Sequence, residues 1–469
     1  MTTPQRLPLT EHQQAGVEWI LRHKRGLLGD EPGMGKTRLA IEAFDRPDLR
    51  VLVVAPAMVI AGGTWADELR KWANHPESFE VVPYTKLNAR ETTASGGNRP
   101  IKKIRPEYDR TYDAVVLDEA HYIKGRATNW TWAVQRLAAR SEYLLAMTGT
   151  PIPNWSHEMF TLLQSIYPAR SKPGGAYGSY WRWVESWFRV KPSPFSETAR
   201  VIGDLVYCSP VCGERPASDP CDHHRDFMDS NFGGQFLRRL RRDCLDLPPV
   251  TTQRIDVPMD AKQKKTYRDL KKQYLAEVDG NEVVAWSDGA KNVLLDKVTT
   301  SLDLLAETPK GKPAGGKLER LAYDLQGRAA PTVVFAHYRA SVEACVKVAE
   351  GVGASAAGIH GGVSKARAAE YVRRFKRGEL DVLVGSLETL AEGQQLTAAD
   401  MLVMVETSFK PSRNEQARMR VDRMGQTRPV TILEYVTPDS VDERKRQLVG
   451  RKTDHQMRML SSRDFAQLL

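Results

Sequence analysis

The clearest candidates for chemistry lie near the N-terminus, in the run Gly29-Asp-Glu-Pro-Gly-Met-Gly-Lys-Thr37. A short apolar step, 26–28, precedes the run, and apolar residues at helical spacing follow it as far as Phe44. A strand, a glycine-rich turn and a helix start in this order bind phosphate, because glycines let the backbone approach the anion and the helix N-terminus offers free N–H groups. The run predicts a nucleotide site in which Lys36 reaches the outer phosphates and Thr37 binds magnesium.

Two adjacent carboxylates form the second candidate. Tyr112 to Leu117 is typical of a strand buried on both faces, and Asp118-Glu119-Ala-His121 follows it. Sites in open α/β sheets form at the carboxyl ends of parallel strands, so this motif should lie beside the phosphate loop. We expect Asp118 to hold the magnesium ion and Glu119 to orient the attacking water and accept its proton. A solvated strand end is the alternative for an isolated Asp-Glu pair.

Two more features belong to the same half. Gln13 lies on a predicted amphipathic helix just before the loop, where its amide can pair with adenine; the alternative is an ordinary surface glutamine. The strand Tyr143 to Met147 leads into Thr148-Gly149-Thr150, whose hydroxyls can relay the state of the γ-phosphate.

Buried strands alternate with helices in both halves of the chain, which predicts an α/β fold. In the first half the apolar runs are 26–28, 51–56, 112–117 and 143–147. In the second half they are 332–336, 381–384, 401–405 and 430–436, with a short strand near Ile359. The second half has no phosphate loop, so it is expected to be a partner lobe and not a second ATPase.

Composition excludes some classes of protein. The chain has 469 residues, of which 41% are hydrophobic, enough for two to four domains. A net charge of +10 suits a polyanionic partner. No apolar run approaches the roughly 18 residues of a membrane span, and the N-terminus lacks a signal-peptide pattern. We expect a soluble intracellular protein of the cytoplasm or nucleoid without a disulfide framework.

Together these motifs make the chain resemble the Swi/Snf family of DNA-translocating ATPases in helicase superfamily two. The matching stretches are Gln13, Asp30-Glu-x-Gly-x-Gly-Lys-Thr37, the Asp-Glu-Ala-His box at 118–121, and Thr148-Gly-Thr-Pro151. The resemblance implies two RecA-like parallel-sheet lobes of the P-loop NTPase type with helical insertions, and ATP with Mg²⁺ as cofactors. Its implied ATP-binding residues are Gln13, Asp30, Gly33, Met34, Gly35, Lys36, Thr37, Arg38, Gly393, Arg420 and Arg423.

The last family motif matches Gln416-Ala-x-x-Arg420-x-x-Arg423-x-Gly-Gln426. Arg420 and Arg423 are three apart on a predicted helix, so both should project from one face. The resemblance implies that they complete the catalytic set of Lys36, Asp118 and Glu119 by stabilising transition-state charge. Gly393 falls in a stretch resembling the motif that grips the tracked strand, and 335–338 with Glu406 resemble the annealing-helicase and fork-remodelling branch.

The middle of the chain departs from the alternating pattern. Cys208, Cys212, Cys221 and His223 are soft ligands in a Pro- and Gly-rich stretch and fit a small zinc clip, although the spacing is not that of a standard finger. Reduced loop cysteines are the alternative. Residues 180–188 are aromatic-rich and predict helical packing, with stacking on bases as the alternative. Residues 236–243 resemble the family's basic helix, whose arginines are expected to contact nucleic-acid phosphates, with a solvated basic face as the alternative.

The sequence predicts five parts: a first RecA-like lobe (1–165), an insertion and interlobe segment (166–250), a helical protrusion and linker (251–316), a second RecA-like lobe (317–450) and a tail (451–469). The predicted partner is duplex or forked DNA, bound through phosphates without sequence preference, with a recruiting protein besides and no membrane. The expected activity is ATP-dependent DNA translocation or remodelling. A strand-separating DNA or RNA helicase and a non-enzymatic, ATP-switched DNA-binding scaffold are the alternatives.

Overall fold

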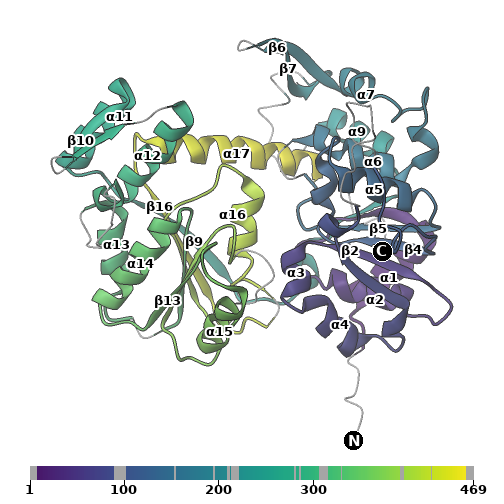
Figure 1. The fold of residues 1–469 in the computed structure, drawn as a ribbon, viewed down its shortest axis with the longest axis horizontal. Coiled ribbons are helices and arrows are strands. Elements are labelled where there is room, and N and C mark those ends of the chain that lie inside the picture. Colours follow the sequence, from purple (N-terminus) through teal and green to yellow (C-terminus); the bar gives the residue numbers. More distant parts are fainter. Residues whose placement is uncertain are drawn as a thin grey trace, which may run out of the picture. The chain divides into compact units, whose positions relative to one another are not determined.

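The protein is described by a computed structural model (Figure 1). It describes residues 8–88, 102–152, 155–193, 196–208, 212, 221–278, 281–284, 287–305, 315–328, 330–390, 396–423 and 425–460. The chain divides into two compact units, Met1–Leu245 with Lys452–Leu469, and Asp246–Arg451. The finer five-part division of the sequence stays a prediction.

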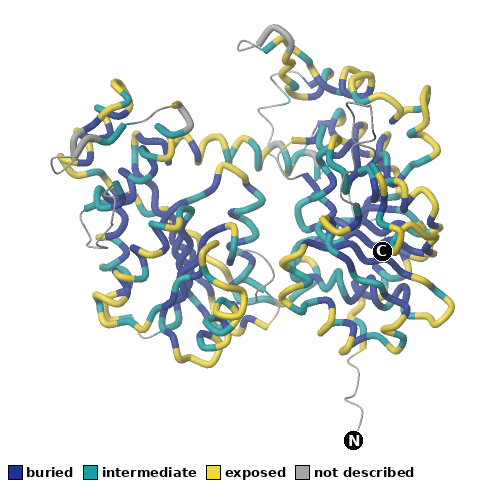
Figure 2. Tube along the Cα trace, in the orientation of Figure 1, coloured by how far each residue is buried: buried dark blue, intermediate teal, exposed yellow. Residues whose placement is uncertain are grey.

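A six-stranded parallel sheet forms the centre of the first unit, in the order β3-β2-β4-β5-β1-β8. Its strands are β1 (Arg25–Leu28), β2 (Val51–Ala55), β3 (Phe79–Pro83), β4 (Ala114–Leu117), β5 (Tyr143–Met147) and β8 (Phe236–Leu237). Every residue of β2 and of β4 is buried, as the continuous apolar runs predict (Figure 2).

Alternate residues of these strands enter two separate cores. Leu52 and Val54 pack on one face and Val51 and Val53 on the other, so helices cover both faces of the sheet. The helices are α1 (Glu11–His23), α2 (Lys36–Phe44), α3 (Ala57–Ala61), α4 (Thr64–Trp72), α5 (Asn129–Ala138) and α6 (Phe160–Ile166).

The segment after α6 belongs to the first unit and has its own elements. These are α7 (Tyr180–Trp187), the antiparallel pair β6 (Phe188–Ser193) and β7 (Ser196–Leu205), α9 (Asp222–Phe232) and α10 (Arg241–Cys244). Trp183 of α7 enters the core, in agreement with the predicted helical packing. The predicted basic helix at 236–243 is wrong, because Phe236 and Leu237 pair with Leu27 and Leu28 as a sheet strand and helix begins only at Arg241.

The second unit has another six-stranded parallel sheet, in the order β13-β14-β12-β15-β16-β9. Its strands are β9 (Val250–Asp256), β12 (Thr332–Ala336), β13 (Ala356–Ile359), β14 (Val382–Ser386), β15 (Met401–Met404) and β16 (Val430–Val436). The other elements are α11 (Ala261–Gln273), β10 (Leu275–Val278), β11 (Asn281–Val284), α12 (Asp288–Thr300), α13 (Gly316–Leu325), α14 (Arg339–Gly351), α15 (Lys365–Lys376), α16 (Pro411–Arg418) and α17 (Val441–Leu460).

Two parallel sheets covered by helices confirm the predicted α/β fold class. Among the residues that the structure describes, no helix combines the length and the apolar character needed to cross a membrane.

Candidate nucleotide site

The phosphate loop connects β1 to α2 at the carboxyl edge of the first sheet. Gly33 and Gly35 adopt positive φ angles of 89° and 83°, a region that side chains disfavour, and α2 begins directly after Gly35. The Lys36 ammonium donates to the carbonyl oxygens of Asp30 and Glu31, at 2.6 and 3.1 Å. The lysine side chain therefore folds back over its own loop, with its charge beside the Asp30 and Glu31 carbonyls.

Gln13 lies against this loop, as the sequence predicts. A Cβ atom placed on Gly35 would lie 2.6 Å from Gln13 Nε2, so the glutamine amide and the glycine backbone are in close approach. The Gln13 side chain is buried, and its oxygen accepts a hydrogen bond from the Thr10 backbone N–H at 3.2 Å in a capping box. These contacts fix the side chain beside the phosphate loop; its pairing with adenine stays a prediction.

Asp118 follows β4 and is held by two aromatic side chains. Trp65 of α4 donates from Nε1 to its carboxylate at 2.9 Å, and the buried Tyr84 hydroxyl donates to its backbone carbonyl at 2.9 Å. Desolvation, with the neighbouring charge of Glu119, raises the pKa of the Asp118 carboxyl to about 6; the Trp65 hydrogen bond and the Lys36 charge oppose this rise. Because the Lys36 charge acts on the pKa of Asp118, the phosphate loop and the acidic motif lie close together.

Glu119 occupies the left-handed region, at φ 49° and ψ 53°, which costs a non-glycine residue about 1–3 kcal/mol. Thr148, directly after β5, donates from Oγ1 to a Glu119 carboxylate oxygen at 3.3 Å. His121 Nδ1 lies 3.3 Å from the same oxygen and 3.1 Å from Thr148 Oγ1. The end of β5 thus contributes a hydroxyl that holds the glutamate in this unusual conformation.

Sequence reasoning did not assign Trp65, Tyr84 or His121 to the site, and it gave Thr148 only a relay role. His121 was detectable as the last residue of the Asp-Glu-Ala-His motif, and Thr148 as the first polar residue after a buried strand. Trp65 and Tyr84 carry no such signal, because their position on Asp118 depends on tertiary packing.

Removing the Thr148 hydroxyl is expected to lower the ATP turnover number about tenfold, because one hydrogen bond to a charged group contributes about 1.5 kcal/mol. Steady-state turnover of Thr148→Val checks this, with ATP binding expected to stay unchanged. Thr161→Val is the matched control, since the Thr161 hydroxyl is buried in α6 and has no hydrogen-bond partner among the described residues. Equal turnover of the two variants would contradict the role of Thr148.

The arginines after β8 bind the phosphate loop. Arg239 donates from its backbone N and from Nε to the fully buried Asp30 carboxylate, at 2.9 and 3.1 Å. Arg238 donates to the Gly29 carbonyl at 2.8 Å, and the Arg241 backbone N–H donates to Glu31 at 2.8 Å. The interpretation of this stretch as nucleic-acid contacts is therefore wrong for the buried Arg239, whose guanidinium is committed to Asp30.

Two other predicted nucleotide residues have side chains engaged inside the unit. The Arg38 guanidinium stacks on the Trp72 ring at 3.8 Å and pairs with Glu42 at 3.5 Å. Met34 is completely buried. The Asp30 side chain is likewise buried, so any contact of Asp30 or Met34 with a nucleotide must come from the backbone. The assignment of Asp30, Met34 and Arg38 to the ATP site stays a prediction.

Arg420 and Arg423 belong to the second unit. The prediction that they share a helix is wrong, because α16 ends at Arg418, Arg420 lies in a turn and Arg423 in a bend. Val421 between them is fully buried in the core, and the Leu396 N–H donates to the Arg420 carbonyl at 2.9 Å. Gly393 lies outside the described residues.

The four predicted zinc ligands come together in the first unit. The ligand atoms of Cys208, Cys212, Cys221 and His223 all lie within 4.8 Å of one another. Cys208 and Cys221 are buried, and all three cysteines are free thiols.

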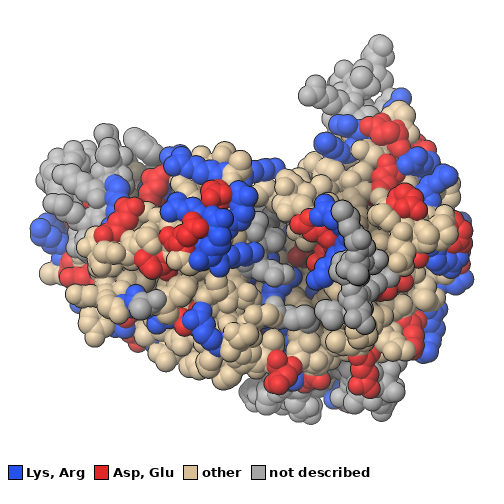
Figure 3. Space-filling model, turned by 90° about the horizontal axis from the view of Figure 1, so that it is seen from below, with Lys and Arg blue, Asp and Glu red and all other residues tan. Residues whose placement is uncertain are grey.

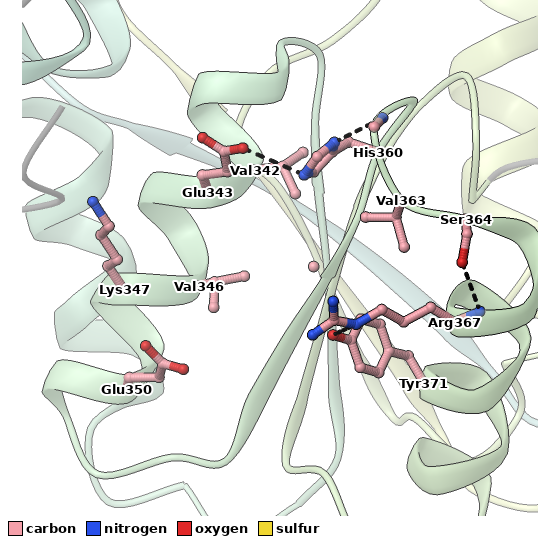
Figure 4. A pocket seen from close by; sticks show the side chains of 12 residues that line it. Val342, Glu343, Val346, Lys347, Glu350, His360, Val363, Ser364, Arg367 and Tyr371 are labelled. Atoms are coloured by element: carbon pink, nitrogen blue, oxygen red, sulfur yellow. Dashed lines mark hydrogen bonds and ion pairs between the residues drawn. The ribbon is translucent and has the colours of Figure 1, made fainter. Parts of the chain in front are cut away.

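A surface pocket of about 600 Å³ lies in the second unit between α14 and α15 (Figure 4). His360 projects into it and pairs through Nε2 with Glu343 at 3.4 Å, while Arg367 donates to the Tyr371 hydroxyl at 2.7 Å. Burial lowers the pKa of His360. None of the predicted nucleotide or metal residues lines this pocket.

Comparisons with known proteins agree with these features. The profile of the SNF2-related domain matches residues 12–301, and that of the helicase conserved C-terminal domain matches residues 316–425. The mouse (Mus musculus) DNA annealing helicase and endonuclease ZRANB3 is 24% identical over 464 residues, covering 95% of this chain and 40% of the relative. The Drosophila melanogaster ATP-dependent helicase brm is 25% identical over 492 residues, covering 93% of this chain and 28% of the relative.

The chain thus spans 40% or less of the length of these two relatives. Among solved structures, the Sulfolobus solfataricus SWI2/SNF2 ATPase core in complex with dsDNA is 19% identical, with a TM-score of 0.40, covering 97% of this chain and 94% of that one. The resemblance to the Swi/Snf family is confirmed by the profile match, which extends over more than half of the sequence. The chain belongs to the SNF2-related family.

Proposed function

We propose that this chain hydrolyses ATP to move along duplex or forked DNA, with translocation or remodelling as its output. The observation that supports this most is the assembly, at one edge of the first sheet, of the phosphate loop, Asp118 and the Glu119–Thr148 pair. A protein that only switches shape on binding ATP has no use for a catalytic glutamate held in this way. Family membership supports the same activity.

The residues present fit ATP with Mg²⁺. Gly33 and Gly35 leave the backbone N–H groups of the loop accessible, and a side chain at Gly35 would collide with Gln13. Thr37, in the first turn of α2, and Asp118 offer the oxygen ligands that Mg²⁺ prefers. When bound, ATP would supply the phosphoryl group, and Mg²⁺ would neutralise part of the negative charge on its phosphates.

Each protein group then has a defined task. Lys36 exchanges its two loop carbonyls for phosphate oxygens, and Gln13 reads the base. Glu119, held by Thr148, orients a water molecule and takes its proton. Arg420 and Arg423 are the remaining residues of the proposed site, and their guanidinium groups stabilise the charge on the reacting phosphate.

DNA is proposed to bind through its phosphates and so without sequence preference. Basic side chains gather in patches on the face shown in Figure 3. In the second unit, α15 and the residue after it expose five basic residues: Lys365, Arg367, Arg373, Lys376 and Arg377. The net charge of +10 supports a polyanionic partner. A recruiting protein stays a prediction from the sequence.

ATP turnover of the purified chain tests this proposal, measured without DNA and with single-stranded, duplex or forked DNA, beside Lys36→Ala. We expect strong stimulation by duplex or forked DNA and none in the variant, which lacks the phosphate-binding ammonium. Stimulation by single strands or RNA alone would favour a conventional helicase. Absence of turnover with every nucleic acid would favour an ATP-switched scaffold.

Two displacement assays separate translocation from strand separation. A translocase on duplex DNA should displace a third strand from a triplex while leaving the underlying duplex paired. A strand-separating helicase should instead release one strand of a tailed duplex at a rate that follows its ATP turnover.

A further inference from the structure

We propose that Cys208, Cys212, Cys221 and His223 bind one zinc ion that fastens the β6–β7 hairpin to α9. Bond lengths of roughly 2.3 Å to sulfur and 2.0 Å to nitrogen place tetrahedral zinc ligands about 3.8 Å apart for two sulfurs and about 3.6 Å for sulfur and nitrogen. The Cys208 and Cys221 sulfurs are 3.5 Å apart, and Cys212 Sγ lies 3.8 Å from His223 Nδ1. These two pairs are close to the separations of tetrahedral zinc ligands, and all four ligand atoms lie within 4.8 Å of one another.

The donor set selects the metal. Three thiols and one imidazole in a tetrahedral arrangement favour zinc over magnesium and calcium, which prefer oxygen. A disulfide does not account for the cluster, because a sulfur–sulfur bond of about 2.05 Å links two cysteines and leaves the third thiol and the histidine without a role. A typical reduced loop cysteine is not buried against three other ligands, as Cys208 and Cys221 are.

A second histidine supports the cluster from outside. His224 is buried, and its Nδ1 lies 3.0 Å from Cys221 Sγ and 3.7 Å from Cys208 Sγ. An N–H donated to a zinc-bound thiolate reduces the charge on sulfur and orients it, as outer-sphere hydrogen bonds do in zinc sites. His223 is assigned as the ligand because its ring nitrogen lies within 4.8 Å of all three sulfurs, and His224 is assigned as a positioning residue.

The position of the cluster indicates what the metal does. Cys208 follows β7, and Cys221 is the N-cap residue of α9, so the ligands connect the hairpin to the helix that follows it among the described elements. The core of the first unit holds Phe227 and Phe232 of α9. Zinc would anchor the hairpin to a helix that is itself fixed in this core, which raises the stability of the folded segment.

Metal analysis of the full-length chain, purified without a polyhistidine tag, tests the proposal without reference to ATP turnover. We expect about one zinc per chain, and Co²⁺ in its place should give the visible bands of a tetrahedral thiolate site. Cys221→Ser should lose the metal, whereas Cys244→Ser, which changes a cysteine outside the cluster, should keep it. Removal of zinc by a chelator should lower the unfolding temperature of the wild type, and added Zn²⁺ should restore it.

The two histidines distinguish ligand from positioning residue. His223→Ala should abolish stoichiometric zinc, and His224→Ala should retain it with affinity about 10–100-fold weaker. The reverse pattern would overturn the assignment of His223. A metal-free protein, bound iron in place of zinc, or a mass two hydrogens lighter from a Cys208–Cys221 disulfide would overturn the zinc site itself.

Discussion

Replacing Glu119 with glutamine is expected to lower ATP turnover by about 10²–10⁴-fold while ATP still binds, because general-base catalysis contributes on this scale. Glutamine keeps an oxygen that can accept the Thr148 hydrogen bond, so the local conformation should persist. What is lost is the capacity to accept a proton from water. Single-turnover hydrolysis, with binding of a fluorescent ATP analogue measured in parallel, separates these effects.

Glu142→Gln is the matched control for this prediction. Glu142 is exposed in the same unit and pairs only with Lys24 among the described residues, at 2.7 Å, so the same chemical change there should leave turnover within twofold or so. Unimpaired hydrolysis by Glu119→Gln would show that another group accepts the proton. Parallel loss of ATP binding would show that Glu119 acts on the structure of the site and not on the chemical step.

The central strands of both sheets were predictable because each is a continuous apolar run. Parallel strands covered by helices on both faces need apolar residues at every position, and this pattern stands out in the sequence. The edge strands lack it. β8 has only two residues, and β9 is a polar, mostly exposed strand, so neither has the signal that revealed β2 or β14.

The catalytic motifs were predictable because their residues are close together in the chain. Their supporting contacts were not. Trp65 lies 53 positions from Asp118, and Arg239 lies 209 positions from Asp30, and no local spacing links such pairs. A run of arginines beside a predicted helix therefore resembled a nucleic-acid surface, although the fold buries Arg239 beneath the phosphate loop.

The end of α16 illustrates a third limit. Arg420 and Arg423 have the spacing of one helical face, but spacing alone does not reveal where a helix stops. Val421 is buried in the core just after the helix ends, and this packing depends on strands brought together only by the folded sheet. The role of the two arginines in the nucleotide site remains a prediction from the motif.

Replacing Arg239 with methionine is expected to destabilise the first unit by about 3–5 kcal/mol, the usual cost of removing one partner from a buried ion pair. Asp30 is completely buried and would lose the guanidinium that now binds both of its oxygens. Arg239 also donates to the His12 carbonyl, so the variant also loses a hydrogen bond to α1. Hydrogen exchange of the β1 and α2 amides in the full chain measures the loss of stability on both sides of the phosphate loop.

Arg242→Met is the control, because Arg242 is 81% exposed and its pairing with Asp243 at the surface contributes little. The double variant Asp30→Asn with Arg239→Met removes the buried charge as well and should recover a large part of the stability, since the cost comes from the unpaired carboxylate and not from lost attraction. The Lys36 ammonium rests on the Asp30 carbonyl, so ATP affinity should follow the same order as stability across these variants. If Arg239→Met unfolds no more readily than Arg242→Met, the ion pair does not hold the phosphate loop, and the loop must be positioned by its glycines and Gln13 alone.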